Sequence, residues 1–433
     1  MAPCSHHRGS RDPTVPALFS SPMSALGEIT ERGSPAWRTR HPPVGRRAPT
    51  PPHRMVRIMT VTGSTTRQQR ILALDVARGI AILGTFAANV WIFTDPAGIV
   101  GYLASIGTDP WPQRILMQLA QGKFLGLLTL MFGIGLAVQA ASAQRAGRPW
   151  PGGYRVRAAL LFVDGVVHYL LVAEFDILMG YALTSMLVCG LVISSRRVRL
   201  WVAGTAVAVH ALAVTALVVA LASSPPNAET PELTTATWWD MIVFRVDNAA
   251  AFRAEVIFVI PMTVALFLTG AALYSSGLFD SRGAVLRRRL MVVGAIAAPL
   301  DLAVSLFGGA AGVFAARYGI APFVALGLLA WIAHFYIGRS TTGTVGTACE
   351  RIGRTALSCY ILQNIVASVL CYDWGFGLAK TVDPAMRVPF TIAVYIAVGA
   401  VMVVGSRWWL GRFRQGPVEW VWRVSYERLT ERR

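Results

Sequence analysis

Long apolar stretches of nearly constant length recur along the chain. A helix needs about 20 apolar residues to cross a hydrocarbon core of about 30 Å, because its backbone must satisfy its own hydrogen bonds there. The predicted spans cover residues 71–93, 114–140, 156–174, 176–195, 200–222, 254–275, 290–307, 319–338, 355–372 and 388–406. The pattern therefore predicts an all-α, polytopic membrane protein with about ten transmembrane helices.

The distribution of charged residues predicts which side of the membrane each loop faces. Hydrophobic residues make up 54% of the chain, charged residues 14%, and the net charge is +18. Nearly all of the basic residues are arginines, and they fall in every second loop, as expected of cytoplasmic loops. This distribution predicts a multi-pass protein of the bacterial plasma membrane with both termini in the cytoplasm, and it argues against a nucleic-acid partner.

The first 66 residues have a different composition from the rest. They are rich in Pro, Arg, Ser and Thr and lack an apolar period, so residues 1–66 are predicted to be a disordered leader. An alternative is that translation starts at Met55 or Met59 rather than at Met1. Residues 67–433 then form one transmembrane domain with a cytoplasmic tail at 407–433.

The first apolar stretch carries three polar side chains that a bilayer penalises. Asp75 and Arg78 are three residues apart, so they share one helix face and form either an ion pair or a substrate-binding pair. Asn89 lies about three turns further along, toward the outer leaflet. Its amide either bonds a neighbouring helix or belongs to a functional site.

The best local acid–base pair lies in the third stretch. Asp164 and His168 are four residues apart, a spacing that lets a carboxylate orient an imidazole for general-base catalysis. The alternative is a pair that only lines a helix contact. Glu174 and Asp176 follow at the next turn and could close a site with His168, although Asp176 could also be a helix N-cap.

The second stretch carries a lysine and several glycines. Lys123 either binds an anionic substrate or extends toward the membrane surface. Gly126, Gly133 and Gly135 indicate close helix packing. The cysteines show no metal-binding spacing, and the chain has no GxSxG, HExxH or Walker A sequence, so no metal site is predicted.

Several sequence blocks resemble the YeiB family, whose C-terminal part, here about residues 240–433, is a domain of unknown function numbered 418. They are SRWWLGRFRQGPVEWVWRVSYERL near the C-terminus, GRTALSCYILQNIV from Gly353, FGIG from Phe132, DILMGYAL from Asp176 and LDVARG in the first stretch. The resemblance covers the chain from about residue 70 to its end.

This family is distantly similar to transmembrane acyltransferases, namely the acyltransferase 3 group and the heparan glucosaminide N-acetyltransferases. The acyltransferase 3 group has a His eleven residues after an Arg in the first helix. In this chain Arg78 corresponds to that Arg, and the residue eleven positions later is Asn89 instead of a His. The resemblance implies an acyl-CoA donor, a glycan or lipid acceptor of the envelope, and a homodimer.

Acyl transfer is accordingly the first functional hypothesis. Arg78 and Lys123 would bind the donor, Asn89 would stabilise the oxyanion, and His168 would deprotonate the acceptor. This requires Arg78, Asn89 and His168 to converge on one cavity. The alternatives are a transporter or exporter of a small molecule or lipid, whose polar groups line a path, and a membrane assembly partner without turnover.

Overall fold

A computed structural model describes residues 58–223, 237–337, 339 and 341–431, with side chains from Leu72 onward. All of them belong to one compact unit, Val56–Arg433, which is described by itself. Most of the predicted leader lies outside the described residues. Residues 58–66, which the prediction assigned to the leader, belong to the helix Ile58–Phe93.

All regular secondary structure in the described residues is helical, which confirms the predicted fold class. The α-helices are α1 (Ile58–Phe93), α2 (Gly98–Ser105), α3 (Trp111–Ala120), α4 (Lys123–Arg145), α5 (Tyr154–Leu171), α6 (Leu178–Val188), α7 (Arg196–Ser223), α8 (Trp238–Asp247), α9 (Ala249–Arg253), α10 (Val256–Ser275), α11 (Ala284–Phe307), α12 (Gly309–Ala315), α13 (Ala321–Tyr336), α14 (Gly343–Arg354), α15 (Ala356–Cys371), α16 (Leu378–Thr381), α17 (Arg387–Leu410) and α18 (Pro417–Glu431). Short helices of other types are η1 (Leu191–Ile193), η2 (Ser281–Gly283), η3 (Ala316–Ile320), which is a π-helix, and η4 (Pro384–Met386).

By length and composition, seven helices in the described residues can cross a membrane, or eight if α14 and α15 form one broken span. The predicted count of ten is therefore not confirmed. When α14 and α15 are counted as one span, two predicted spans account for the difference. Helix α5 has 18 residues but carries Arg155, Arg157 and Asp164, and α6 has only 11 residues.

Small residues let the central helices approach closely. Helix α4 packs against α1, α10 and α13. A Cβ at Gly133 would collide with the backbone of Phe267 on α10, and one at Gly126 would press on Ala325 of α13. These two glycines confirm the predicted close packing. Gly135 does not, because nothing lies within 4 Å of the position of its absent Cβ.

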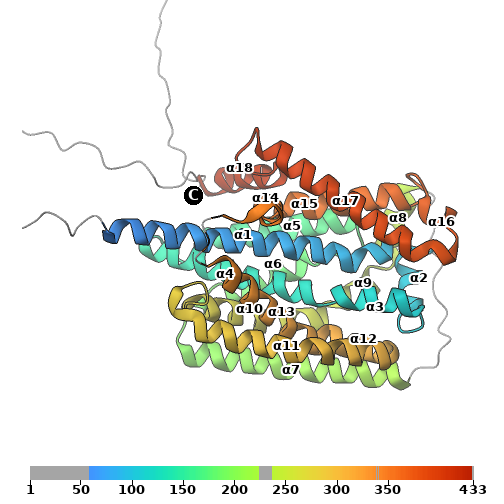
Figure 1. The fold of residues 1–433 in the computed structure, drawn as a ribbon, viewed down its shortest axis with the longest axis horizontal. Coiled ribbons are helices and arrows are strands. Elements are labelled where there is room, and N and C mark those ends of the chain that lie inside the picture. Colours follow the sequence, from blue (N-terminus) through green and yellow to red (C-terminus); the bar gives the residue numbers. More distant parts are fainter. Residues whose placement is uncertain (1–57, 224–236, 338, 340, 432–433) are drawn as a thin grey trace, which may run out of the picture. The chain divides into compact units, whose positions relative to one another are not determined.

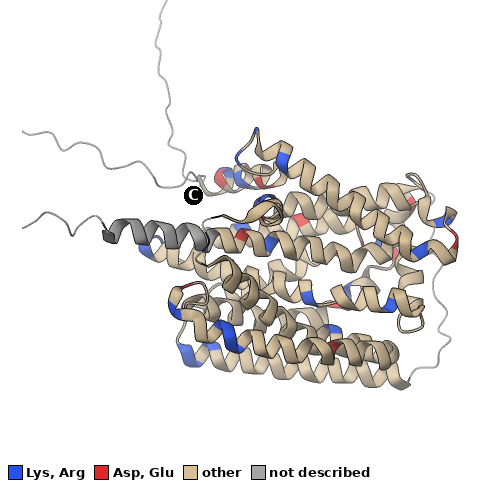
Figure 2. Ribbon diagram, in the orientation of Figure 1, with Lys and Arg blue, Asp and Glu red and all other residues tan. Residues whose placement is uncertain are grey.

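The long helices run side by side, with α7 and α11 at one edge and α17 near the other (Figure 1). Several basic side chains lie at the end where α7 and α11 begin (Figure 2). Helices α14 and α15 meet at an angle of 92°. Glu419 of α18 accepts the backbone N–H groups of Leu357 (2.8 Å) and Ser358 (3.2 Å), and so caps α15 at this bend.

Candidate functional site

A buried histidine forms the centre of the site. The Nδ1 of His168, on α5, lies 3.0 Å from Oδ1 of Asp176, and neither side chain is exposed. The Nε2 lies 3.0 Å from Nδ2 of Asn364, on α15. The imidazole also packs on the ring of Tyr360, one turn before Asn364, with 4.9 Å between centroids. A carboxylate this close to Nδ1 favours the tautomer with its proton on Nδ1, which leaves the lone pair on Nε2.

Asp176, rather than Asp164, is the carboxylate that pairs with His168. The predicted local pair is therefore wrong, because Asp164 faces Trp422 of α18. Asp176 does lie next to His168, as the sequence suggested, and a functional site formed by the two stays a prediction. The second oxygen of Asp176 accepts the backbone N–H of Met179 at 3.2 Å, so it also stabilises the start of α6.

Two arginines that the sequence analysis missed hold the segment between α5 and α6. Arg245, on α8, is 1% exposed and places its Nε 3.2 Å from Oε2 of Glu174. It also donates to the carbonyl oxygens of Leu170 (3.0 Å) and Val172 (3.1 Å). Arg253, on α9, donates to the carbonyl oxygens of Glu174 (2.6 Å) and Asp176 (3.2 Å). These bonds fix Asp176 against His168.

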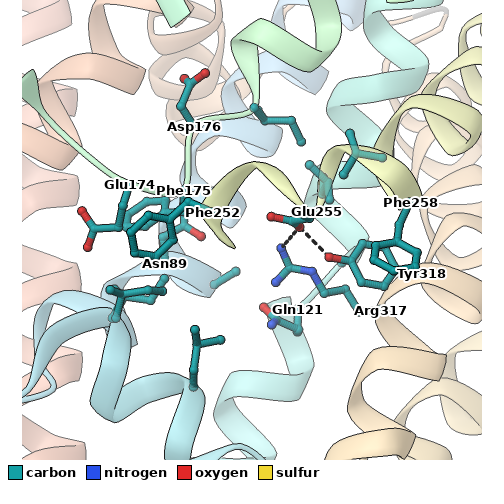
Figure 3. A pocket seen from close by; sticks show the side chains of 18 of the residues that line it. Asn89, Gln121, Glu174, Phe175, Asp176, Phe252, Glu255, Phe258, Arg317 and Tyr318 are labelled. Atoms are coloured by element: carbon teal, nitrogen blue, oxygen red, sulfur yellow. Dashed lines mark hydrogen bonds and ion pairs between the residues drawn. The ribbon is translucent and has the colours of Figure 1, made fainter. Parts of the chain in front are cut away.

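A first cavity of about 290 Å³ adjoins this segment (Figure 3). Its polar lining residues are Asn89, Gln121, Glu174, Asp176, Arg253, Glu255, Arg317, Tyr318 and Tyr360. Glu255 accepts from Arg317 at 3.0 Å and from the hydroxyl of Tyr318. Phe175, Phe252 and Phe258 line the same space. Polar groups with aromatic walls are typical of sites for small organic ligands.

A second cavity of about 400 Å³ lies elsewhere in the bundle. Its polar and aromatic lining residues are Arg78, Phe132, Gln139, Tyr154, Arg157, Ser185, Arg354, Tyr360, Glu419 and Trp422. Three arginines against one carboxylate make this lining basic. Tyr360 lines both cavities, so its ring lies in the partition between them.

The predicted binding residues divide between these spaces. Arg78 lines the second cavity, where its guanidinium lies 2.8 Å from Asp75, so the predicted Asp75–Arg78 pair exists. Asn89, Glu174 and Asp176 line the first. His168 is buried between them rather than lining either. The expectation that Arg78, Asn89 and His168 converge on one cavity is therefore wrong.

Lys123 does not approach either cavity. Its ammonium pairs with Asp301 of α11 and donates to the carbonyl oxygens of Gln118 (2.6 Å) and Gln121 (3.3 Å). An ammonium has three N–H groups, so none is left for a substrate in this arrangement. Lys123 lies instead beside an apolar groove between α4, α11 and α13.

Asn364 and Tyr360 were named only within a sequence block, and neither was predicted as a site residue. A usable signal was present, because the four-residue spacing places both side chains on one face of α15. Within the part of the chain that the structure describes, no three His, Cys, Asp or Glu side chains come together in a way that could bind a metal ion.

Comparison with known proteins supports the family that the sequence blocks indicated. Residues 273–428 match the family described as "Protein of unknown function (DUF418)". "Uncharacterized protein YeiB" of Escherichia coli (strain K12) is 30% identical over 383 residues, which cover 82% of this chain and 96% of that protein. "Uncharacterized protein YxaH" of Bacillus subtilis (strain 168) is 27% identical over 410 residues, 83% of this chain and 95% of that protein. The chain therefore belongs to the YeiB family of bacterial membrane proteins with a DUF418 region.

Proposed function

We propose that the protein transfers an acyl group across the membrane, from a donor in the second cavity to an acceptor in the first. The observation that supports this proposal is that one residue, Tyr360, forms part of the wall of both cavities. The imidazole of His168 packs against the ring of Tyr360. When donor and acceptor come from opposite sides of a membrane, the groups that bind them belong in different cavities. This two-cavity arrangement replaces the single cavity expected from the sequence, because Arg78 and Asn89 line different cavities.

The charges support an orientation. The second cavity is lined by Arg78, Arg157 and Arg354, and basic residues are retained on the cytoplasmic side of membrane proteins. The first cavity is lined by Glu174, Asp176 and Glu255. In the proposed orientation the basic cavity opens to the cytoplasm and both termini are cytoplasmic.

The basic cavity suits an acyl-CoA donor, since guanidinium groups bind phosphates. Its volume of about 400 Å³ suits the acyl-bearing end of such a donor. In this proposal Arg78 contacts the donor directly. Lys123 has no part in donor binding, because Asp301 and two carbonyl oxygens occupy its ammonium.

The chemistry assigns one role to each residue of the cluster. An acceptor hydroxyl or amine attacks the thioester carbonyl, a C–O or C–N bond forms, and the C–S bond breaks. Nε2 of His168 takes the acceptor proton and returns it to the leaving thiolate. Asp176 holds the proton on Nδ1, and the amide of Asn364 must move off Nε2 as the acceptor arrives. Asn89 donates a hydrogen bond from the first cavity.

Free coenzyme A reports the reaction. Protein in nanodiscs is mixed with acyl-CoA, with and without lipid and glycan fractions of a bacterial envelope, and released thiol is measured. Acceptor-dependent release that His168→Ala abolishes supports the proposal. The same rate with His168→Ala, in protein that still elutes as a folded particle, removes His168 as the base. Thiol release that is independent of every acceptor fraction contradicts acyl transfer.

A transporter is the second candidate, and one observation favours it. Both ring nitrogens of His168 lie 3.0 Å from a partner, and the side chain is fully buried. A buried pair of a histidine and a carboxylate beside two cavities is also what a proton-coupled carrier uses. Uptake of a small solute into proteoliposomes, driven by a pH gradient and without thiol release, would establish this candidate instead.

A further inference from the structure

Helix α7 is the least enclosed of the long helices. Only 11% of its most apolar window is buried, and Val214 is its one buried residue. It lies at the edge of the bundle, where it contacts α10, α12 and η3 (Figure 1). In a bilayer the remaining surface of α7 faces lipid chains. An apolar helix surface gains about as much from contact with lipid chains as from contact with neighbouring apolar helices. Packing alone therefore holds α7 weakly.

His210 adds a polar attachment to this face. Its Nδ1 lies 3.1 Å from the carbonyl oxygen of Phe258 on α10, and its Nε2 lies 3.0 Å from that of Tyr318 in η3. Carbonyl oxygens only accept, and a neutral imidazole has a single N–H. A neutral ring therefore donates to one of the two carbonyl oxygens at a time, whichever tautomer it adopts.

The same face of α7 closes the first cavity. Leu217 follows His210 by two helical turns and lines that cavity, together with Phe258 and Tyr318. Helix α7 thus lies between the cavity and the surrounding lipid. If α7 moved away from α10 and η3, the cavity would open sideways into the bilayer.

Charged groups of the neighbouring elements face this attachment. Glu255, just before α10, binds Arg317 and the hydroxyl of Tyr318, both in η3. His210 bonds the backbone one turn after Glu255 and the backbone of Tyr318 itself. The attachment therefore joins α7 to the two segments that form the polar wall of the first cavity.

We propose that α7 is a lateral door held by His210, and that a lipid-linked acceptor enters the first cavity from the bilayer through it. This inference rests on the proposed function because the entering lipid is taken to be the acyl acceptor. Entry of a lipid from the bilayer does not itself require acyl transfer. The polar head occupies the cavity near Glu255 and Arg317, and the acyl chains remain in the bilayer between α7 and α10. The imidazole of His210 holds the door closed by donating a hydrogen bond to the carbonyl oxygen of Phe258 or of Tyr318.

Photolabelling tests this door directly. The full chain is placed in nanodiscs that contain a phospholipid with a diazirine in its acyl chain, and labelled peptides are identified by mass spectrometry. Labelling of the peptide with Phe258 should be about threefold higher in His210→Ala than in the wild type at the same pH, since one interhelical hydrogen bond is lost.

One control separates the door from general loosening. Leu212, on the lipid-facing side of α7, is 73% exposed and should be labelled equally in both samples. Labelling at Phe258 that is unaffected by His210→Ala overturns the proposal. Labelling does not depend on thiol release, so failure of acyl transfer and failure of the door are distinguishable.

Discussion

At the scale of single residues, the contact between Asp176 and His168 is the most consequential feature of the site. Replacing Asp176 by Asn keeps the shape but can place a donor against Nδ1, which favours the wrong tautomer. We expect Asp176→Asn to lower acceptor-dependent thiol release by about 10² to 10⁴-fold. Asp164→Asn is the matched control, because Asp164 faces Trp422 instead. An equal loss in both variants would contradict the assignment.

A second prediction at this scale concerns stability. Glu174→Ala leaves the guanidinium of Arg245 buried without its carboxylate, and both side chains are only 1% exposed. We expect a loss of about 3 to 5 kcal/mol in the free energy of unfolding, measured by denaturant titration in detergent. Lys380→Ala removes the exposed pair with Asp373 and should change stability by less than about 1 kcal/mol. A smaller effect of Glu174→Ala than of Lys380→Ala would show that Arg245 does not depend on this pair.

At the scale of helices, close approach between α4 and α10 depends on glycine. A Cβ at Gly133 meets the backbone of Phe267, which cannot turn aside as a flexible side chain can. Gly133→Ala should therefore destabilise the protein by about 1 to 3 kcal/mol, despite the better helix propensity of alanine. Gly135→Ala meets nothing within 4 Å and should be neutral or stabilising. Thermal unfolding in detergent measures the stability of both variants. An unfolding temperature of Gly133→Ala that is not below that of Gly135→Ala would mean that the helices are loosely packed at Gly133.

The helices themselves were largely predictable, because a membrane span depends on the local length of an apolar stretch. Helix α5 and helix α6 differ from prediction because one carries three charges and the other is short, so tertiary contacts must hold them. The site was less predictable. Asn364 lies 196 residues from His168, and Arg245 lies 71 residues from Glu174. Pairs so far apart in the sequence cannot be recognised from local residue spacing. Asp75 and Arg78 were recognised because they lie three residues apart on one helical turn.

At the scale of the whole molecule, the two cavities matter because one aromatic ring separates them. Tyr360 is 3% exposed and lines both spaces. We expect Tyr360→Ala to join them into one water-accessible path, since removing a large ring from a packed core leaves a cavity. Proteoliposomes that contain this variant should lose an imposed pH gradient faster than those with the wild type, as measured with a trapped pH-sensitive dye.

The conservative replacement makes this test specific. Tyr360→Phe keeps the ring against His168 and should hold the gradient as the wild type does. A leak in both variants would mean that the hydroxyl, and not the ring, seals the partition. A tight membrane with Tyr360→Ala would mean that further side chains separate the cavities. In that case a single transfer step at His168 could not reach substrates bound on both sides, and the proposed cross-membrane reaction would fail with it.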